Sequence, residues 1–169
     1  QCYVQQDIQA AFDQAIKRLD QHIIDGLKQF PLIHEQVTRL RDIPGFGPVN
    51  SATVVFESGN LQRFKNHKPY ISYARLTPGI AQSGEKSQHG RGRKCGNHHL
   101  KRAYSCAAMH AGRLSQVIER FRDRHREHRS SHQACHLIVN SIVAHKLATG
   151  VFYMLTRNES FQEERLFPR

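Results

Sequence analysis

A polar, basic and glycine-rich stretch in the middle of the chain holds the residues best suited to chemistry. It runs from Gln82 to Asn97, and Ser83 lies near its start. Glycines allow a backbone to approach a phosphodiester closely, and Arg and Lys side chains neutralise its charge. A serine hydroxyl in such surroundings can attack phosphorus if a base removes its proton. The plainer interpretation of Ser83-Gly84 is a turn, which the residues alone favour.

The distribution of charge indicates an anionic partner. The chain has 25 Lys and Arg against 14 Asp and Glu, a formal net charge of +11 and a pI near 10.0. Ten basic residues and one acidic residue, Glu85, lie between Gln62 and Arg102, whereas the first 42 residues hold five basic and six acidic ones. Localised positive charge of this kind is typical of proteins that bind nucleic acids. The basic side chains expected to contact phosphate are Lys86, Arg91, Arg93, Lys94, Lys101 and Arg102.

A second candidate for phosphate binding is the segment from Arg41 to Pro48, which we interpret as a tight turn between two helices. Gly45 follows a proline and helps to end the first helix. Gly47 is expected to take a backbone conformation closed to residues with a Cβ, and Pro48 suits the first turn of the next helix. The first helix is predicted from apolar residues at helical spacing, which are Val37, Leu40 and Ile43.

Such a helix-hairpin-helix element binds nucleic acid by pointing backbone N–H groups and the positive end of the second helix at a phosphate. Because no base is read, the contact would not depend on the DNA sequence. The alternative is a helical corner that only packs against the rest of the domain. In the first case, the backbone around Gly45 and Gly47 would touch the phosphate.

Apolar residues at steps of three and four predict helices along the rest of the chain. The segment 5–30 is expected to be one long amphipathic helix, which either pairs with another copy as a coiled coil or lies on the core of its own domain. Asn97 is a good N-cap for a helix that follows it, and further helices are expected over 116–129 and 132–155. No convincing strand pattern occurs, although the Gly-rich stretch has room for a short hairpin. The faces expected to be buried include Ala52, Val55, Phe56, Leu100, Ala103, Ala107 and Leu114.

These patterns predict an all-α fold with a helix-hairpin-helix core, a long N-terminal helix and a Gly-rich basic loop. We divide it into a connector helix (1–31), a central domain (32–130) and a C-terminal helix with a polar tail (131–169). No run of about 18 apolar residues is present, so no segment is expected to cross a membrane. The four cysteines do not suggest a disulfide framework, and a reducing bacterial cytoplasm is the simplest location.

Five short motifs occur in order along the chain, and together they resemble a known family. They are Ile43–Pro48, Phe64, Tyr73–Pro78, Gln82–Gly84 and Lys94–Arg102. This set resembles the C-terminal domain of the insertion-sequence transposases related to the Piv DNA invertase, a family linked to bridge RNAs. The resemblance is close over residues 38–115 and looser in the flanking helices.

The resemblance implies that the domain takes part in DNA transposition and that Ser83 is the nucleophile that attacks DNA. It also matches Lys94, Gly96 and Asn97 to the family's signature. Arg75 departs from the pattern, because the family usually has a small residue there, most often Gly. The implied partners are DNA, a guide RNA and a second copy of the chain, which would pair through the N-terminal helix.

In that family an RNase H-like N-terminal domain supplies four metal-binding carboxylates, which would hold Mg²⁺. The acidic residues of this chain are scattered, and no strand carries an Asp that could begin such a site. We therefore expect this chain to be the C-terminal part of a transposase, as a fragment, a decayed gene or a truncated product, and to be unable to cut DNA alone.

Two other functions remain open on the sequence. The first is a DNA- or RNA-binding module without a nucleophile, and the second is a helical bundle that binds proteins. A zinc site is a further alternative, because two Cys-His pairs occur close together. Its ligands would be Cys95, His98, Cys106 and His110.

Overall fold

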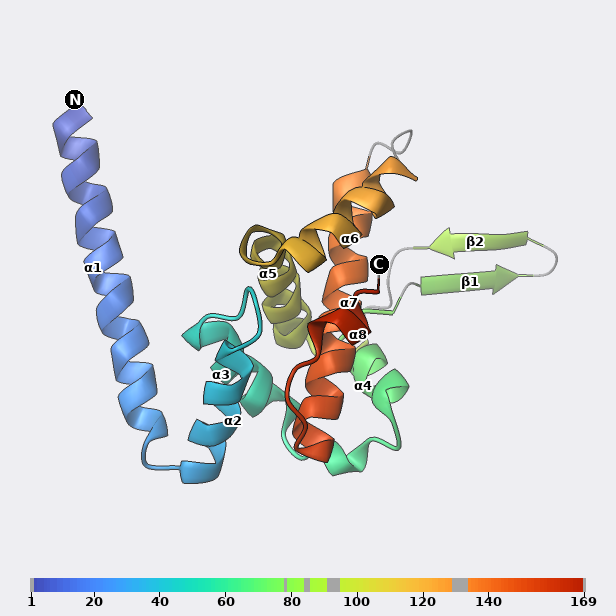
Figure 1. Cartoon of the computed structure of the whole chain (residues 1–169), viewed down its shortest axis with the longest axis horizontal. Coiled ribbons are helices and arrows are strands. Elements are labelled where there is room, and N and C mark those ends of the chain that lie inside the picture. Colours follow the sequence, from blue (N-terminus) through green and yellow to red (C-terminus); the bar gives the residue numbers. More distant parts are fainter. Residues whose placement is uncertain (1, 78, 84–85, 91–94, 129–133, 169) are drawn as a thin grey trace.

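The computed structural model describes residues 2–77, 79–83, 86–90, 95–128 and 134–168, with the backbone alone for 2–4, 79–83 and 86–90. This part of the chain is mainly helical, as predicted, with eight α-helices, one short 3-10 helix and a two-stranded hairpin (Figure 1). The elements are α1 (Cys2–Leu27), α2 (Pro31–Arg41), α3 (Pro48–Ser58), η1 (Leu61–Arg63), α4 (His67–Tyr73), β1 (Gly79–Ser83), β2 (Lys86–Gly90), α5 (His98–Leu114), α6 (Gln116–Glu127), α7 (Cys135–Arg157) and α8 (Glu163–Leu166).

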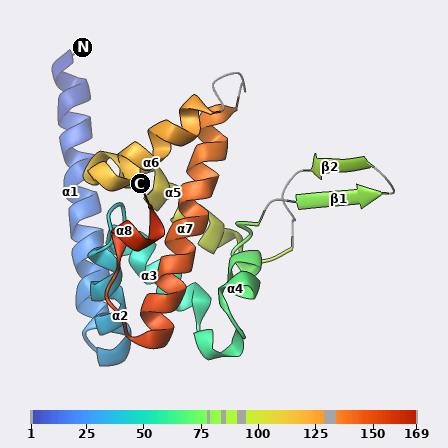
Figure 2. The same ribbon diagram turned by 45° about the vertical axis from the view of Figure 1, so that its right-hand side comes forward.

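The long N-terminal helix exists, and most of it stands away from the helical body (Figures 1 and 2). Its apolar seam is exposed over most of its length. Near the C-terminal end Leu27 is only 4% exposed and joins the core. The alternative in which this helix lies on the core of its own domain is therefore wrong for most of the helix. Seam residues more than half exposed are Ile8, Phe12, Ile16 and Leu19.

The core is built around α5 and α7, which pack against each other. Small residues form the inner face of α5, and they allow the neighbouring helices to approach closely. On α7 the corresponding face is made of Val and Ala residues and of Leu147, all fully buried. The buried residues form one cluster from Leu27 to Phe167, and the proposed boundaries near residues 31 and 130 stay predictions. The small buried residues of α5 are Ala103, Ala107, Ala108 and Ala111.

Helix α7 is long and apolar enough to cross a membrane by length and composition, although half of its most apolar window is buried inside the protein. Polar residues such as Asn140, His145 and Lys146 interrupt its apolar sequence, and its half-buried window is that of a core helix. Its position at the centre of the core explains the composition. A helix surrounded by other helices is apolar on most of its faces.

Two positions on the predicted buried faces are wrong. Phe56 is 57% exposed and Leu114 is 69% exposed. The face of α3 that does enter the core is rotated toward Ser51, Val54 and Ser58. This rotation fits the approach of α5, whose small side chains leave room for α3 on that side.

Part of the Gly-rich stretch forms an antiparallel hairpin instead of the predicted loop. In this hairpin β1 pairs with β2 from Gly79 opposite Gly90 to Ser83 opposite Lys86. It extends away from the helices, and only its base lies near α4 (Figures 1 and 2). The sequence of the two strands lacks the alternation of apolar and polar residues that usually indicates a strand.

Candidate nucleic-acid interface

The turn between α2 and α3 lies against the C-terminal half of α5. Ile43 and Phe46 are 1% and 6% exposed and anchor the turn in the core. Between them Gly45 has a φ of +91°, a backbone conformation that side chains with a Cβ rarely adopt. A Cβ at Gly45 would lie 2.2 Å from the carbonyl oxygen of Ala107 and 2.9 Å from the amide nitrogen of Ala111. Gly45 is therefore needed for packing.

Gly47 differs from the prediction, because its φ is −89° and its ψ is 175°, an extended conformation open to any residue. The special conformation belongs to Gly45 instead. No atom lies within 4 Å of where a Cβ of Gly47 would be, so this side of the turn is open. Pro48 occupies the first turn of α3, as predicted.

The N-terminus of α3 has free backbone donors. No side chain caps it, and the first intrahelical hydrogen bond runs from the Ser51 N–H to the Gly47 carbonyl at 3.0 Å. Within the described part of the chain, the N–H groups of Val49 and Asn50 therefore have no acceptor. The partial positive charge of a helix N-terminus adds to their attraction for an anion.

A cavity of about 620 Å³ opens beside this turn, and side chains from α2, α3 and α5 line it. Arg41 comes from the end of α2, whereas His110 and Arg113 come from the last two turns of α5. Asp42 is the only acidic residue among the lining residues. These basic residues were not predicted as site residues, because only tertiary packing brings Arg113 next to a turn about 70 positions earlier.

The other end of α5 begins at Gly96 and Asn97. The φ of Gly96 is +118°, and a Cβ there would lie 2.5 Å from the Tyr73 carbonyl oxygen. Asn97 is the predicted N-cap, and its Oδ1 accepts hydrogen bonds from the N–H groups of His99 (2.9 Å) and Leu100 (3.0 Å). Both residues fix the start of α5 against α4.

Asn97 also links three helices through its remaining groups. Its backbone N–H donates to the Tyr73 carbonyl at 2.6 Å, and its Nδ2 donates to the Glu57 carboxylate at 2.6 Å. Asn97 and Arg63 both hydrogen-bond the Tyr73 hydroxyl, and these bonds lower the pKa of that phenol. The Arg63 guanidinium also lies 4.8 Å from the centroid of the Tyr73 ring. Neither Arg63 nor Tyr73 was predicted as a site residue from the sequence.

Arg75 has a φ of +57°, in the left-handed region. This finding gives a physical reason why a glycine is expected at this position. Its Cγ also lies 2.9 Å from where a Cβ of Gly96 would be. The turn after α4 and the start of α5 are therefore closely fitted to each other.

The predicted catalytic and basic residues of the Gly-rich stretch lie on the hairpin or beyond it. Ser83 pairs with Lys86 in the last described rung, farthest from the helices. Arg91, Arg93 and Lys94 lie outside the described residues. On the first turn of α5, Lys101 and Arg102 are exposed.

The selected residues therefore form two groups at opposite ends of α5. The turn with Gly45 and Gly47 lies beside His110 and Arg113, whereas the hairpin leads to Asn97 and Lys101. Helix α5 has 17 residues, which corresponds to a length of about 25 Å. The structure does not bring the two groups together.

The described residues hold no group of three or more His, Cys, Asp or Glu side chains that could bind a metal ion. Cys95 is exposed, whereas Cys106 is partly buried on α5. Neither zinc nor Mg²⁺ therefore has a fitting ligand set in this part of the chain.

The central part of the chain matches a known protein family. The family model described as "Transposase IS116/IS110/IS902 family" matches residues 37–126, which is more than half of the chain. The chain belongs to this transposase family. Its domain is thus a transposase domain that acts in DNA transposition and binds DNA. The match runs from α2 to α6 and includes both ends of α5. A search of curated proteins finds no match.

Proposed function

We propose that this transposase domain grips the DNA backbone through the α2–α3 turn, used as a helix-hairpin-helix element. The observation that carries the proposal is the uncapped N-terminus of α3 inside a cavity with Arg41, His110 and Arg113. A phosphate in this cavity would accept hydrogen bonds from the N–H groups of Val49 and Asn50. The open space at Gly47 lets the phosphate approach the backbone.

This grip would be insensitive to sequence, because backbone donors and cations contact phosphate and not base edges. The two arginines would neutralise phosphates on either side of the turn. Gly45 would serve the grip indirectly, by seating the turn against Ala107 and Ala111 of α5. We also propose that Lys86, Arg91, Arg93, Lys94, Lys101 and Arg102 contact DNA or a guide RNA.

We further propose that Ser83 is the nucleophile of strand transfer. A base would remove the proton of the Ser83 hydroxyl, and its Oγ would attack the phosphorus. The bond from phosphorus to the sugar oxygen would break, and the sugar would leave as a hydroxyl after taking up a proton. The DNA strand would then be held as a phosphate ester of Ser83. The position of Ser83 opposite Lys86 in the hairpin, next to a strongly basic segment, supports this role. The described residues offer no fitting set of ligands for Mg²⁺, and the step involves only Ser83, a base and the DNA.

The exposed seam of α1 supports pairing with a second copy of the chain. Four large apolar side chains at helical spacing are left uncovered on the helix, and a coiled coil would bury them. We propose a homo-oligomer joined through α1, and the bacterial cytoplasm, where the DNA lies, as its location.

A salt titration of duplex DNA binding tests the grip. We expect the double variant Arg41→Gln/Arg113→Gln to bind about tenfold more weakly and to lower the salt slope by about 2, because about 0.9 counterions are released per phosphate contact. Gly47→Val should also weaken binding, since it fills the open approach without disturbing the fold. The control is Lys17→Gln/Arg18→Gln on the exposed face of α1, which removes the same net charge. Equal losses in the control and the Arg41/Arg113 variant would exclude a specific grip at the turn.

A non-catalytic DNA-binding module is the second candidate, because the cavity with Arg41, His110 and Arg113 would bind DNA without a nucleophile. Ser83→Ala separates the two functions. Binding to DNA should survive in both cases. Strand transfer, measured with a carboxylate domain supplied in the assay, should disappear only if Ser83 is the nucleophile.

A further inference from the structure

A groove at the base of the hairpin is lined by cations, and none of its described lining residues carries a carboxylate. It lies between α5 and α7, is closed at one side by the turn after α4 and by α8, and has a volume of about 610 Å³. Four basic side chains come from four different elements, and His145 adds a fifth titratable group. They are Arg75, Lys101, Lys146 and Arg165. We call this site the α5–α7 groove.

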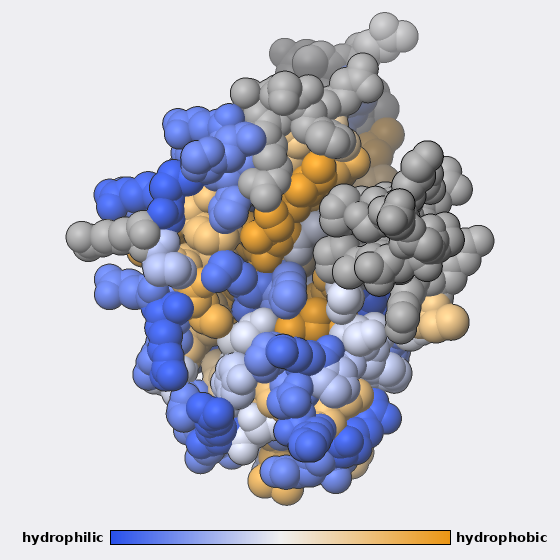
Figure 3. Space-filling view, turned by 90° about the vertical axis from the view of Figure 1, so that its right-hand side faces the viewer, coloured by the Kyte–Doolittle hydropathy of each residue, from blue (hydrophilic) through white to orange (hydrophobic). Residues whose placement is uncertain are grey.

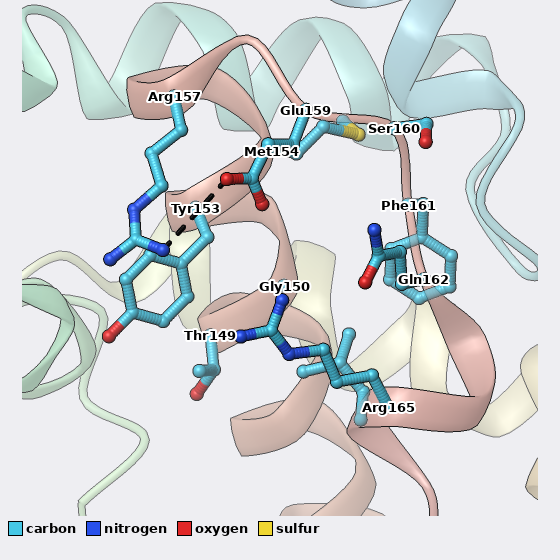
Figure 4. A pocket seen from close by; sticks show the side chains of 11 residues that line it. Thr149, Gly150, Tyr153, Met154, Arg157, Glu159, Ser160, Phe161, Gln162 and Arg165 are labelled. Carbon is cyan, nitrogen blue, oxygen red and sulfur yellow. Dashed lines mark ion pairs between the residues drawn. The ribbon is translucent and has the colours of Figure 1, made fainter.

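Four other cavities each have at least one acidic side chain among their described lining residues. In the cavity shown in Figure 4, Arg157 pairs with Glu159 at 3.9 Å and lies over the Tyr153 ring. That arginine already has an anionic partner. No acidic side chain is among the described lining residues of the α5–α7 groove, and its positive charge would attract an external anion.

Two of its cations are unused by the described part of the protein. Lys101 and Arg165 are exposed and make no side-chain hydrogen bond or ion pair there. Arg165 lines both this groove and the cavity of Figure 4, in which its guanidinium is directed from α8 toward Thr149 and Gly150 of α7. Lys146 differs, because its Nζ donates to the Leu166 carbonyl at 2.6 Å. Lys101 and Arg165 are therefore the cations available to a ligand.

The lining is also partly apolar. Ile138 and Ile142 of α7 are half-buried in the groove, together with Leu166, and Ser141 is exposed beside them. The face of the molecule that carries the hairpin shows hydrophilic residues around an apolar strip (Figure 3). Cations at the rim suit phosphates, and an apolar surface suits the sugars and base faces that a double helix hides in its stack.

We propose that the α5–α7 groove holds unpaired nucleotides of a nucleic-acid strand, with phosphates on Lys101 and Arg165. Its volume of about 610 Å³ falls in the range of about 300–1,000 Å³ that encloses small ligands, which suits one or two nucleotides. The inference rests on the proposed function, because the strand would continue from DNA gripped at the other end of α5. The unpaired strand could be DNA or RNA, which share this chemistry.

The test compares binding of fluorescein-labelled oligonucleotides of one sequence as single-stranded DNA, single-stranded RNA and duplex DNA. The variants are Lys101→Gln/Arg165→Gln, and Ser141→Glu, which places an acidic side chain at an exposed helical position in the groove. Lys17→Gln/Arg18→Gln is again the charge-matched control. Melting temperatures verify that each variant folds.

We expect both groove variants to weaken single-strand binding about tenfold, with a salt slope lower by about 1.4 in the double variant. Duplex binding should change no more than in the control. The oligonucleotide whose affinity falls more, single-stranded DNA or single-stranded RNA, identifies the kind of strand that the groove binds.

Single-strand affinity that falls only as much as in the control would overturn the inference, as would an equal loss of affinity for duplex DNA. Loss of duplex binding in Arg41→Gln/Arg113→Gln with no effect of the groove variants would leave the grip intact and reject the groove alone. Wild-type protein that binds none of the oligonucleotides would reject the proposed function itself.

Discussion

The two glycines of the α2–α3 turn should respond to the same substitution in opposite ways. In Gly45→Ala, the new methyl group would lie 2.2 Å from a backbone oxygen of α5, and backbone cannot move aside cheaply. A side chain at a φ of +91° adds about 1–2 kcal/mol of strain, and overpacking adds about 1–3 kcal/mol. We expect a loss of about 2–5 kcal/mol, a large share of the roughly 5–15 kcal/mol that stabilises a typical domain.

Gly47→Ala is the matched control, because the chemical change is identical and the site lies two residues further along the same turn. Its φ of −89° suits alanine, and no atom lies within 4 Å of the new methyl group. The free energy of unfolding should stay the same or rise by about 0.4–1 kcal/mol, because alanine restricts the unfolded chain.

Thermal and urea unfolding followed by circular dichroism measure both effects. At this chain length each kcal/mol shifts the melting temperature by about 2–4 °C, so Gly45→Ala should melt lower by about 4–20 °C. A Gly45→Ala protein that melts together with the wild type would refute the close packing of the turn on α5. A large loss in Gly47→Ala would refute the extended conformation assigned to Gly47.

Two further predictions concern the turn after α4 and the buried tyrosines. Arg75→Gly should raise the free energy of unfolding by about 0.5–1 kcal/mol in urea titrations, because it removes the strain of a side chain at a φ of +57°; a lower stability would mean that contacts of the arginine outweigh the strain. Burial raises the pKa of Tyr70 to about 12, above the value of 10 in the unfolded chain. The unfolded state therefore releases this proton first, and stability should be complete below pH 10 and fall between pH 10 and about 12. Tyr70→Phe should reduce this alkaline loss in unfolding experiments across that range, whereas an unchanged pH dependence would count against the buried phenol as its source.

The helices could be predicted because their evidence is local. Spacing of apolar residues indicates a helix wherever one face is buried, and Asn97 and Pro48 mark helix starts by their own chemistry. The choice between Gly45 and Gly47 could not be made this way. It depends on how closely Ala107 of α5 approaches the turn, and that approach is a property of the packed domain.

The site residues also divide into those that local sequence predicts and those that only tertiary packing brings together. Lys101 and Asn97 were selected because they belong to a continuous basic motif, whereas Arg41 and Arg113 lie in ordinary helical sequence and meet only in the folded domain. The hairpin was not a firm prediction, because its two strands lack the alternation of apolar and polar residues that indicates a half-buried strand. Arg75 shows the reverse case, in which a departure from the family's usual glycine pointed to a position where the backbone itself is unusual.

The separation of the two groups along α5 constrains how the domain can work. A length of about 25 Å corresponds to about seven base pairs at 3.4 Å each. If one DNA molecule contacts both ends of α5, the phosphate gripped at the α2–α3 turn is therefore not the one that Ser83 attacks. The turn would hold the helix axis in place, and the hairpin would act on a strand several base pairs away. The α5–α7 groove lies at the hairpin end, where unpaired nucleotides would emerge if the duplex opened between the two contacts.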